Sequence, residues 1–334
     1  MGVNISELLP KKEIKFDDLN NKVIAIDAFN ALYQFLSSIR QLDGSPLMDS
    51  EGNVTSHLQG LFSRSLNLLN RGIKIVYVFD GKAPLLKEKE RNLRKEQRLK
   101  GYKKYIEAIE KKNIEEMQKY AKTTSRLTQV MIEESKDLIK ALGLPIIEAP
   151  SEAEAQAAFM CKNNDVYATA SQDADSLLFG SPILIRNLTL SQKRKTAYGK
   201  IVYTFLEEIK LEETLRSLEI NHEQLINLGI LIGTDFNPGG VKGIGPRKAL
   251  KLVKTHQPEE IFKNVDFNWR EIHDIFTDIP VNKNYKLRWN SIHEEGLKEI
   301  LIEKHDFNEE RIDLALEKVK NILKKEQNNL TKFF

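Results

Sequence analysis

Short apolar runs with the length of buried strands recur along this chain, and longer segments with helical apolar spacing separate them. The strand-like runs are Val23–Ile26, Ile75–Phe79, Pro145–Glu148, Val166–Ala170 and Pro182–Ile185. The intervening helical patterns cover Ala31–Ile39, Thr55–Asn70 and Leu127–Leu142. Strands that alternate with helices form parallel sheets whose faces the helices cover. The pattern therefore predicts an α/β fold with a mostly parallel, twisted sheet flanked by helices.

A highly charged segment interrupts this alternation from Lys82 to about Lys122. A charge run is most often a solvated helix face. This one directly follows a strand end, so it would project over the sheet edge at which ligands bind, and its cations would meet phosphates there. Since it has few apolar anchors, such an insertion can order and disorder.

Acidic residues follow the predicted strands. They are Asp27 and Asp80 after the first two runs, Glu152 and Glu154 after the third, and Asp173 and Asp175 after the fourth. The carboxyl ends of parallel strands share one edge of a sheet, so these acids would converge, and like charges need a cation beside them. Ligand sets made of oxygen alone select Mg²⁺ or Mn²⁺. We expect two ions about 3.5–4 Å apart, the arrangement that hydrolyses phosphodiesters.

Each acidic pair also has a purely structural interpretation. Ser151 and Glu154 have the spacing of a capping box, with Ser151 as the N-cap. Asp173 and Asp175 suit a loop and a helix start. The coincidence of acids at four strand ends favours the metal site.

A glycine-rich loop, Gly233–Lys248, lies between a predicted helix over His222–Ile232 and a second one that runs to about Lys254. Its glycines would let backbone amides approach a phosphate at the N-terminus of the second helix. The candidate phosphate-binding residues are Lys242, Gly243, Gly245, Arg247 and Lys248. The alternative is a merely structural connection between helices.

The composition favours a soluble, intracellular protein over a membrane protein or a secreted one. The chain has 334 residues, a net charge of +3 and a pI near 8.6, and no apolar run approaches the length of a membrane span. Its single cysteine, Cys161, allows no internal disulfide, which suits a reducing, intracellular compartment. The six histidines show no metal-ligand spacing. Trp269 and Trp289 are expected in the core.

The C-terminus carries two aromatic residues on a polar tail. A charged amphipathic helix is predicted from Glu309 to about Lys325, and Phe333 and Phe334 follow it. Exposed aromatic pairs are costly without a partner, so we expect this tail to dock in a partner's pocket.

From Met1 to Phe334 the chain resembles the flap endonucleases, archaeal and eukaryotic 5′ nucleases specific for DNA structure. The matching segments are Ala25–Asp27, Tyr33–Leu36, Val76–Lys82, Ala149–Ala155, Ser171–Asp175, Gly233–Asp235 and Gly240–Gly245. One departure is Ala83, where the family pattern has a second proline before Pro84.

The resemblance implies roles for individual residues. Two Mg²⁺ ions would bind, and Mn²⁺ could replace them. The first ion would be surrounded by Asp27, Asp80, Glu152 and Glu154, and the second by Asp173, Asp175 and Asp235. Some of these contacts would be made through water. Lys87 and Arg94 match the family's catalytic cations, and Tyr33 matches an aromatic near the scissile nucleotide, although it is equally a core tyrosine. Gln327, Leu330, Phe333 and Phe334 match the sliding-clamp-binding box.

The implied organisation is a PIN-like nuclease core with two DNA-binding additions. The segments are the core at 1–82 and 127–220, a helical arch at 83–126, a helix-hairpin-helix (H3TH) module at 221–256, a C-terminal helical region of the core at 257–325, and the clamp-binding tail at 326–334.

The implied function is Mg²⁺-dependent cleavage of branched DNA near the base of a 5′ flap, with 5′–3′ exonuclease side activity, in Okazaki fragment maturation and repair. A monomeric, intracellular enzyme is expected, cytoplasmic if archaeal and nuclear if eukaryotic. The alternatives are a 5′ exonuclease or junction-cutting relative, or a non-catalytic DNA-binding scaffold.

Overall fold

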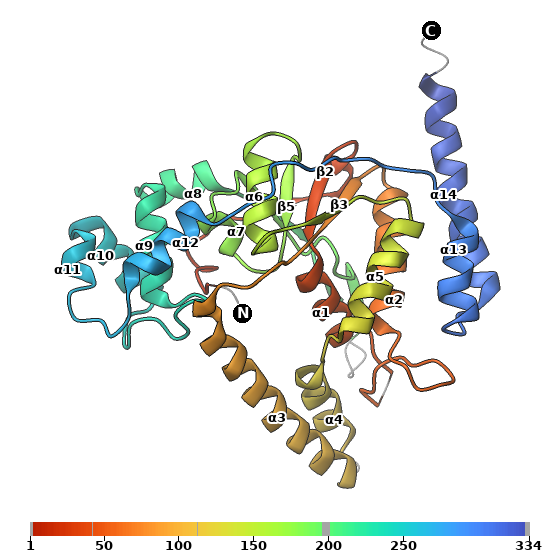
Figure 1. The fold of residues 1–334 in the computed structure, drawn as a ribbon, viewed down its shortest axis with the longest axis horizontal. Helices are drawn as coiled ribbons and strands as arrows, with labels where there is room; N and C mark the ends of the chain where they lie inside the picture. The colour runs from red at the N-terminus through yellow and green to blue at the C-terminus, as the bar shows by residue number, and fades with distance from the viewer. Residues whose placement is uncertain (1–2, 42, 112, 196–200, 331–334) are drawn as a thin grey trace.

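A computed structural model describes residues 3–41, 43–111, 113–195 and 201–330. Its centre is a seven-stranded sheet of order β1-β9-β6-β5-β2-β3-β4 (Figure 1). The strands are β1 (Lys12–Ile14), β2 (Val23–Asp27), β3 (Lys74–Phe79), β4 (Ile146–Glu148), β5 (Ala168–Ala170), β6 (Ile183–Arg186) and β9 (Leu206–Lys210). From β6 to β4 the neighbours are parallel, which confirms the predicted architecture.

Four strands, β1, β7, β8 and β9, were not predicted from the sequence. β9 pairs antiparallel with β6, and β1 pairs antiparallel with β9, so one side of the sheet ends in two antiparallel strands. A separate hairpin joins β7 (Lys193–Lys195) to β8 (Ile201–Tyr203). β1 and β9 are rich in Lys and Glu and lack the long apolar runs that identified the central strands.

The central strands are apolar on both faces because helices cover both. Ile75 and Tyr77 of β3 join the cluster formed with α1 (Ala28–Ser38), α2 (Ser56–Leu69) and α5 (Gln129–Ala141). Val76 and Val78 point to the other face and pack with α6 (Ala153–Lys162). A third cluster holds α7 (Asp175–Leu178), α9 (His222–Ile232), α10 (Pro246–Thr255) and α12 (Trp269–Asp278). The loop between β9 and α9 carries α8 (Leu211–Leu218).

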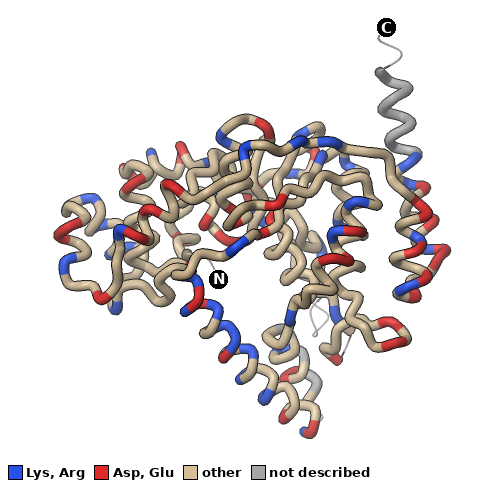
Figure 2. Tube along the Cα trace, viewed as in Figure 1, with Lys and Arg blue, Asp and Glu red and all other residues tan. Residues whose placement is uncertain are grey.

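The charged insertion forms a helical projection. The 3₁₀ turn η2 (Leu85–Lys87) leads into α3 (Glu88–Glu110), and α4 (Ile114–Ala121) returns through η3 (Lys122–Thr124). α3 and α4 extend away from the sheet as two arms of a V (Figure 1), and Lys and Arg lie along α3 (Figure 2). Only Glu90, Gly101 and Ala108 of α3 are buried, so little packing holds this helix to the body.

The C-terminal part differs from the expected helical region. The helices of this part are α11 (Pro258–Ile261), α12, α13 (Glu294–Lys298), the π-helical turn η4 (Glu299–Glu303) and α14 (Glu309–Leu330). Between α12 and α13, residues 279–293 contain no helix and run as an extended strap across the molecule (Figure 1). Hydrogen bonds join this strap to the core. The side chain of Gln156 bonds to the backbone N–H and C=O of Asn282, and Trp289 Nε1 of the strap donates to Ile75 O at 2.9 Å. Trp289 and Trp269 are half-buried against two different clusters.

α14 also runs five residues beyond the predicted end at Lys325, to Leu330, so Gln327 and Leu330 belong to a helix along the backbone. Phe333 and Phe334 lie outside the described residues.

Candidate functional site

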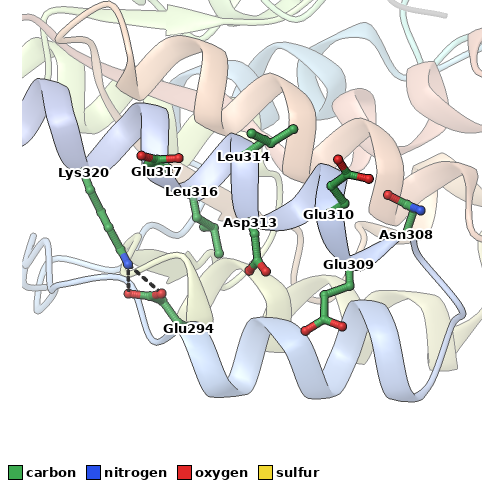
Figure 3. A pocket seen from close by; sticks show the side chains of 9 residues that line it. All are labelled: Glu294, Asn308, Glu309, Glu310, Asp313, Leu314, Leu316, Glu317 and Lys320. Atoms are coloured by element: carbon green, nitrogen blue, oxygen red, sulfur yellow. Dashed lines mark hydrogen bonds and ion pairs between the residues drawn. The ribbon is translucent and has the colours of Figure 1, made fainter.

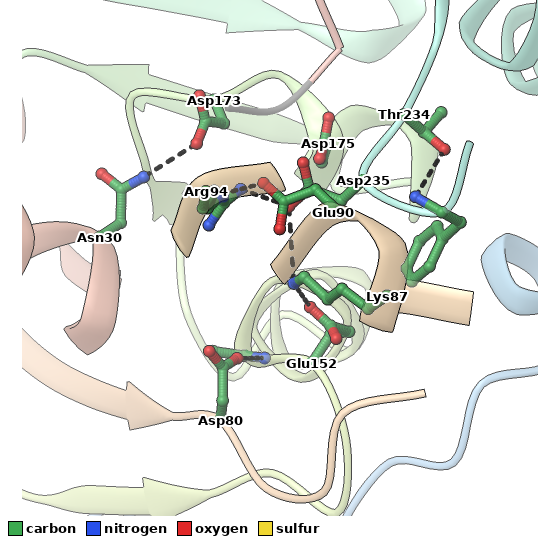
Figure 4. A network of polar contacts seen from close by, with 12 residues as sticks. Asn30, Asp80, Lys87, Glu90, Arg94, Glu152, Asp173, Asp175, Thr234 and Asp235 are labelled. Carbon is green, nitrogen blue, oxygen red and sulfur yellow. Dashed lines mark hydrogen bonds and ion pairs between the residues drawn. The ribbon is translucent and has the colours of Figure 1, made fainter. Parts of the chain in front are cut away.

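Acidic side chains from five parts of the chain meet at one edge of the sheet. Asp27 ends β2, Asp80 follows β3, Glu152 and Glu154 begin α6, Asp173 and Asp175 lie at the start of α7 beyond β5, and Asp235 follows α9. Figure 4 shows five of them around a common space. The fold therefore brings together all seven acids named from the sequence.

Burial and mutual repulsion disfavour the charged forms of these acids. Burial, with Asp80 and Asp173 nearby, raises the pKa of Asp27 to about 8. Burial, with Asp235 and Asp173, raises the pKa of Asp175 to about 7. Burial, with Asp175 and Asp27, holds the pKa of Glu154 well above its usual value. These acids are thus close enough to affect one another's ionisation.

Lys87 and Arg94 supply the positive charge nearest to the acids. Lys87 Nζ lies 2.5 Å from Glu152 Oε2 and 3.6 Å from Asp235 Oδ2, and Arg94 Nη2 donates to the same Asp235 oxygen at 2.8 Å (Figure 4). Burial by itself lowers the pKa of Lys87, but Glu152 and Glu154 outweigh it and the pKa is raised. Lys87 therefore stays charged.

Glu90 is a further member of this network that the sequence analysis did not single out. It is 7% exposed, its Oε1 pairs with Arg94 Nε one helical turn away, and its Oε2 has no hydrogen-bond partner among the described residues. Its spacing from Arg94 in the sequence was the only available signal.

Backbone amides hold three of the acids in place, and the first is Asp27, whose Oδ1 accepts from Asn30 N at 3.0 Å. Asp80 Oδ1 accepts a 2.6 Å hydrogen bond from Ala153 N, at the first residue of α6. Asp175 Oδ1 accepts one of 2.6 Å from Val3 N, 172 residues away in the sequence. The alternative interpretation of Ser151 and Glu154 as a capping box is wrong, because the N-cap of α6 is Glu152 and not Ser151. Glu154 consequently does not have the structural role that competed with metal binding.

The site fits divalent cations that keep part of their water shell. Its ligands are all carboxylate oxygens, which suit Mg²⁺ and Mn²⁺, and the raised pKa values show that the local charge is not fully balanced by Lys87 and Arg94. Among the described residues, no three acidic, histidine or cysteine side chains are arranged to hold an ion by direct contact alone. Mg²⁺ usually retains several waters, through which acids at this spacing can reach it.

Tyr33 lies on α1 and is 37% exposed, so it is not a core tyrosine. This exposure removes the structural alternative but does not itself assign a role.

The glycine-rich loop has the geometry expected of a backbone anion site. Gly245 is the N-cap of α10, Pro246 is its first residue, and Gly243 has a φ of +79°. A Cβ built at Gly243 or Gly245 would meet nothing within 4 Å, so the space in front of the helix N-terminus is open. Lys242, Arg247 and Lys248 are exposed around it.

A separate cavity of about 730 Å³ lies between α13 and α14 (Figure 3). Glu294, Glu309, Asp313 and Glu317 line it, and Lys320 is paired with Glu294. An acidic wall repels phosphate, so this cavity is not a candidate for nucleic-acid binding. Within the described ranges, no helix has the length and apolar character needed to cross a membrane.

Comparison with known proteins gives consistent matches. The models of the XPG N-terminal domain and the XPG I-region match residues 3–101 and 143–235. Flap endonuclease 1 of Pyrococcus abyssi is 52% identical over 328 residues, covering 97% of this chain and 95% of that protein. The same enzyme of Pyrococcus furiosus is 50% identical over 340 residues, covering 100% and 99%. The structure of flap endonuclease-1 from Methanococcus jannaschii is 42% identical, has a TM-score of 0.80, and covers 97% of this chain and 100% of its own.

The acid cluster makes stability depend on pH and on metal. Since the pKa of Asp27 rises from 3.8 to about 8 on folding, the folded metal-free protein keeps a proton that the unfolded chain has lost between those values. The free energy of unfolding is therefore highest below the pKa that Asp27 has in the unfolded chain, and it decreases as the pH rises through the pKa that Asp27 has in the folded protein. In EDTA, the thermal midpoint should fall between pH about 6 and 8.5, by the equivalent of a few kcal/mol at most.

Excess Mg²⁺ should raise the midpoint most at the alkaline end, and Asp27→Asn should flatten the metal-free pH dependence. Differential scanning calorimetry measures both. A midpoint that is insensitive to pH and to Mg²⁺ would contradict the charge imbalance.

Proposed function

This chain belongs to the flap endonuclease family, and on that premise we propose that it hydrolyses branched DNA near the base of a 5′ single-stranded flap, as a structure-specific nuclease of replication and repair. The observation that carries the proposal is the convergence of seven acids with Lys87 and Arg94 at one sheet edge. Nucleases of this family depend on metal. Replication and repair take place inside the cell, so an intracellular location is part of the proposal.

Two Mg²⁺ ions are proposed at this edge, with Mn²⁺ as a possible substitute. The first would be surrounded by Asp27, Asp80, Glu152 and Glu154, and the second by Asp173, Asp175 and Asp235. Bound ions would polarise the scissile phosphate and activate a nucleophilic water. The protein's contribution is to hold the carboxylates at fixed positions, through the amides of Ala153 and Val3, and to present Lys87 and Arg94 beside them.

Lys87 and Arg94 change partners in this proposal. Without metal they balance Glu152 and Asp235. When ions take over that balance, the two side chains become available to stabilise charge that develops on the scissile phosphate. Tyr33, exposed on α1, is proposed to contact the nucleotide at that phosphate.

Branched DNA is proposed to bind at two further places. α3 and α4, within the arch at 83–126, would face the flap with the cations of α3. The open N-terminus of α10, in the H3TH module at 221–256, would hold a duplex phosphate through Gly243, Gly245 and the basic residues around them. Recognition through backbone phosphates depends on DNA shape and not on base sequence.

The remaining assignments concern partners. One chain contains the complete acid set, so the catalytic unit is proposed to be a monomer. The tail at 326–334 is proposed to bind a sliding clamp through Gln327, Leu330, Phe333 and Phe334. Removal of Phe333 and Phe334 should abolish the stimulation of cleavage by the clamp and leave cleavage without the clamp intact. The proposed nuclease core consists of the segments 1–82 and 127–220 together with the C-terminal helical region at 257–325.

The test of the function is cleavage of a 5′-labelled double-flap DNA, beside a blunt duplex and a plain single strand, with Mg²⁺ and with EDTA. A Mg²⁺-dependent product released at the flap junction is expected, since the acids converge at a single site. Asp175→Asn should still bind the DNA and not cut it. Laddered products would indicate a 5′ exonuclease, and binding without any product would indicate a scaffold.

Lys87→Met should lower the single-turnover rate about 10²–10³-fold, because a donor aimed at the reacting phosphate contributes on that scale. The matched control is Lys89→Met, two residues further along the chain at an exposed position in the first turn of α3. It removes the same charge from the arch and should leave the single-turnover rate close to that of the unmodified enzyme. Equal losses in the two variants would reduce the role of Lys87 to general attraction of DNA.

Arg247→Ala should weaken duplex binding and lower the slope of log K against log salt concentration by about 1, as expected for one lost phosphate contact. Lys254→Ala is the control, because it lies in the last turn of α10 and pairs with Glu219 at 2.8 Å. Fluorescence anisotropy across a salt series measures both slopes. An unchanged slope for Arg247→Ala would contradict the phosphate contact.

A further inference from the structure

Asn30 links the ends of two adjacent strands. It is the third residue of α1, and its backbone amide donates to Asp27 Oδ1 at 3.0 Å, at the end of β2. Its side chain reaches across to the loop after β5, where Nδ2 donates to Asp173 Oδ2 at 3.1 Å and Oδ1 accepts from Gln172 N at 3.4 Å (Figure 4). β2 and β5 are parallel neighbours in the sheet. One residue therefore contacts an acid from each side of the site.

Like Asp173, five other acids of the site accept hydrogen bonds that hold their carboxylates, but from different kinds of donor. Asp27, Asp80 and Asp175 accept backbone hydrogen bonds, and Glu152 and Asp235 accept from cationic side chains. Asp173 accepts its bond from a neutral amide. A neutral donor fixes one carboxylate oxygen without cancelling the charge that attracts a cation.

We propose that Asn30 is a positioning residue for divalent metal: its amide fixes Asp173 relative to Asp27 and so sets the affinity of the site for the ion that Asp173 faces. This inference rests on the proposed metal-dependent function. Asn30 itself acts through Asp173 and need not contact the metal.

The side-chain amide suits this position chemically. It donates to a carboxylate and accepts from a backbone N–H at the same time, which neither a hydroxyl of shorter reach nor a carboxylate can do here. Asn30, Asp27 and Thr189 also line a cavity of about 10 Å³, at the lower limit for one water molecule. Truncating Asn30 would enlarge this space and admit water, which can bond to Asp173 without fixing its orientation.

The experiment is a calorimetric titration of DNA-free Asn30→Ala with Mg²⁺ and with Mn²⁺, together with cleavage rates across a Mg²⁺ series. The expected result is a rise of about 10–100-fold in the metal Kd and in the Mg²⁺ concentration for half-maximal cleavage, as for other residues that orient metal ligands. The cleavage rate at saturating Mg²⁺ should return close to that of the unmodified enzyme.

Gln34→Ala is the matched control. Gln34 lies one turn further along α1, is half-buried, and bonds to Thr189 beside the same cavity. Its loss should leave the metal Kd unchanged. An unchanged Kd in Asn30→Ala, or an equal rise in both variants, would overturn the proposal.

Asn30→Ser is a second variant with a smaller change in polarity, and thermal unfolding in EDTA reports whether each variant folds. Loss of folding in both Asn30 variants would show that the amide is structural and would overturn the proposal. The titration needs no DNA, so an unmodified enzyme that binds Mg²⁺ but cuts no flap would refute the proposed function and leave this comparison decisive.

Discussion

Repulsion among buried carboxylates is the constraint on which the rest of this structure depends. Burial and close like charges raise the pKa values of Asp27, Glu154 and Asp175, so the sheet edge is an unfavourable place for acids unless cations lie beside them. The protein partly offsets this cost with Lys87 and Arg94. The remaining imbalance favours the divalent ions proposed there, so the charges that cost stability in the free protein are the ones that would bind metal.

The arch depends on this constraint because it has little other packing. α3 has three buried residues, and its first turns are held to the body through the ion pairs of Lys87 with Glu152 and of Arg94 with Asp235. The start of this charged segment is therefore held by the same carboxylates that form the candidate metal site.

The sequence predicted the parts of the fold whose signal is local. Central strands are apolar on both faces, and α9 has the boundaries that its apolar spacing indicated. The antiparallel strands β1 and β9 were missed because they are short and charged, and the strap at 279–293 was missed because its stability comes from side chains elsewhere, such as Gln156. The capping-box interpretation at Ser151 was wrong because α6 begins after Glu152, so the third residue of the helix is Ala155 and not Glu154.

By itself, the sequence determined the parallel core, the acids at its strand ends and the chemical class of ion they suit, because strand direction and ligand type follow from local residue patterns. The tertiary structure decided which groups meet: Lys87 with Glu152, Arg94 with Asp235, Val3 with Asp175 and Asn30 with Asp173. These pairs join residues 65 to 172 positions apart. Distance along the chain carries no information on such contacts, which depend on how strands order themselves in the sheet and on where the helices pack against it.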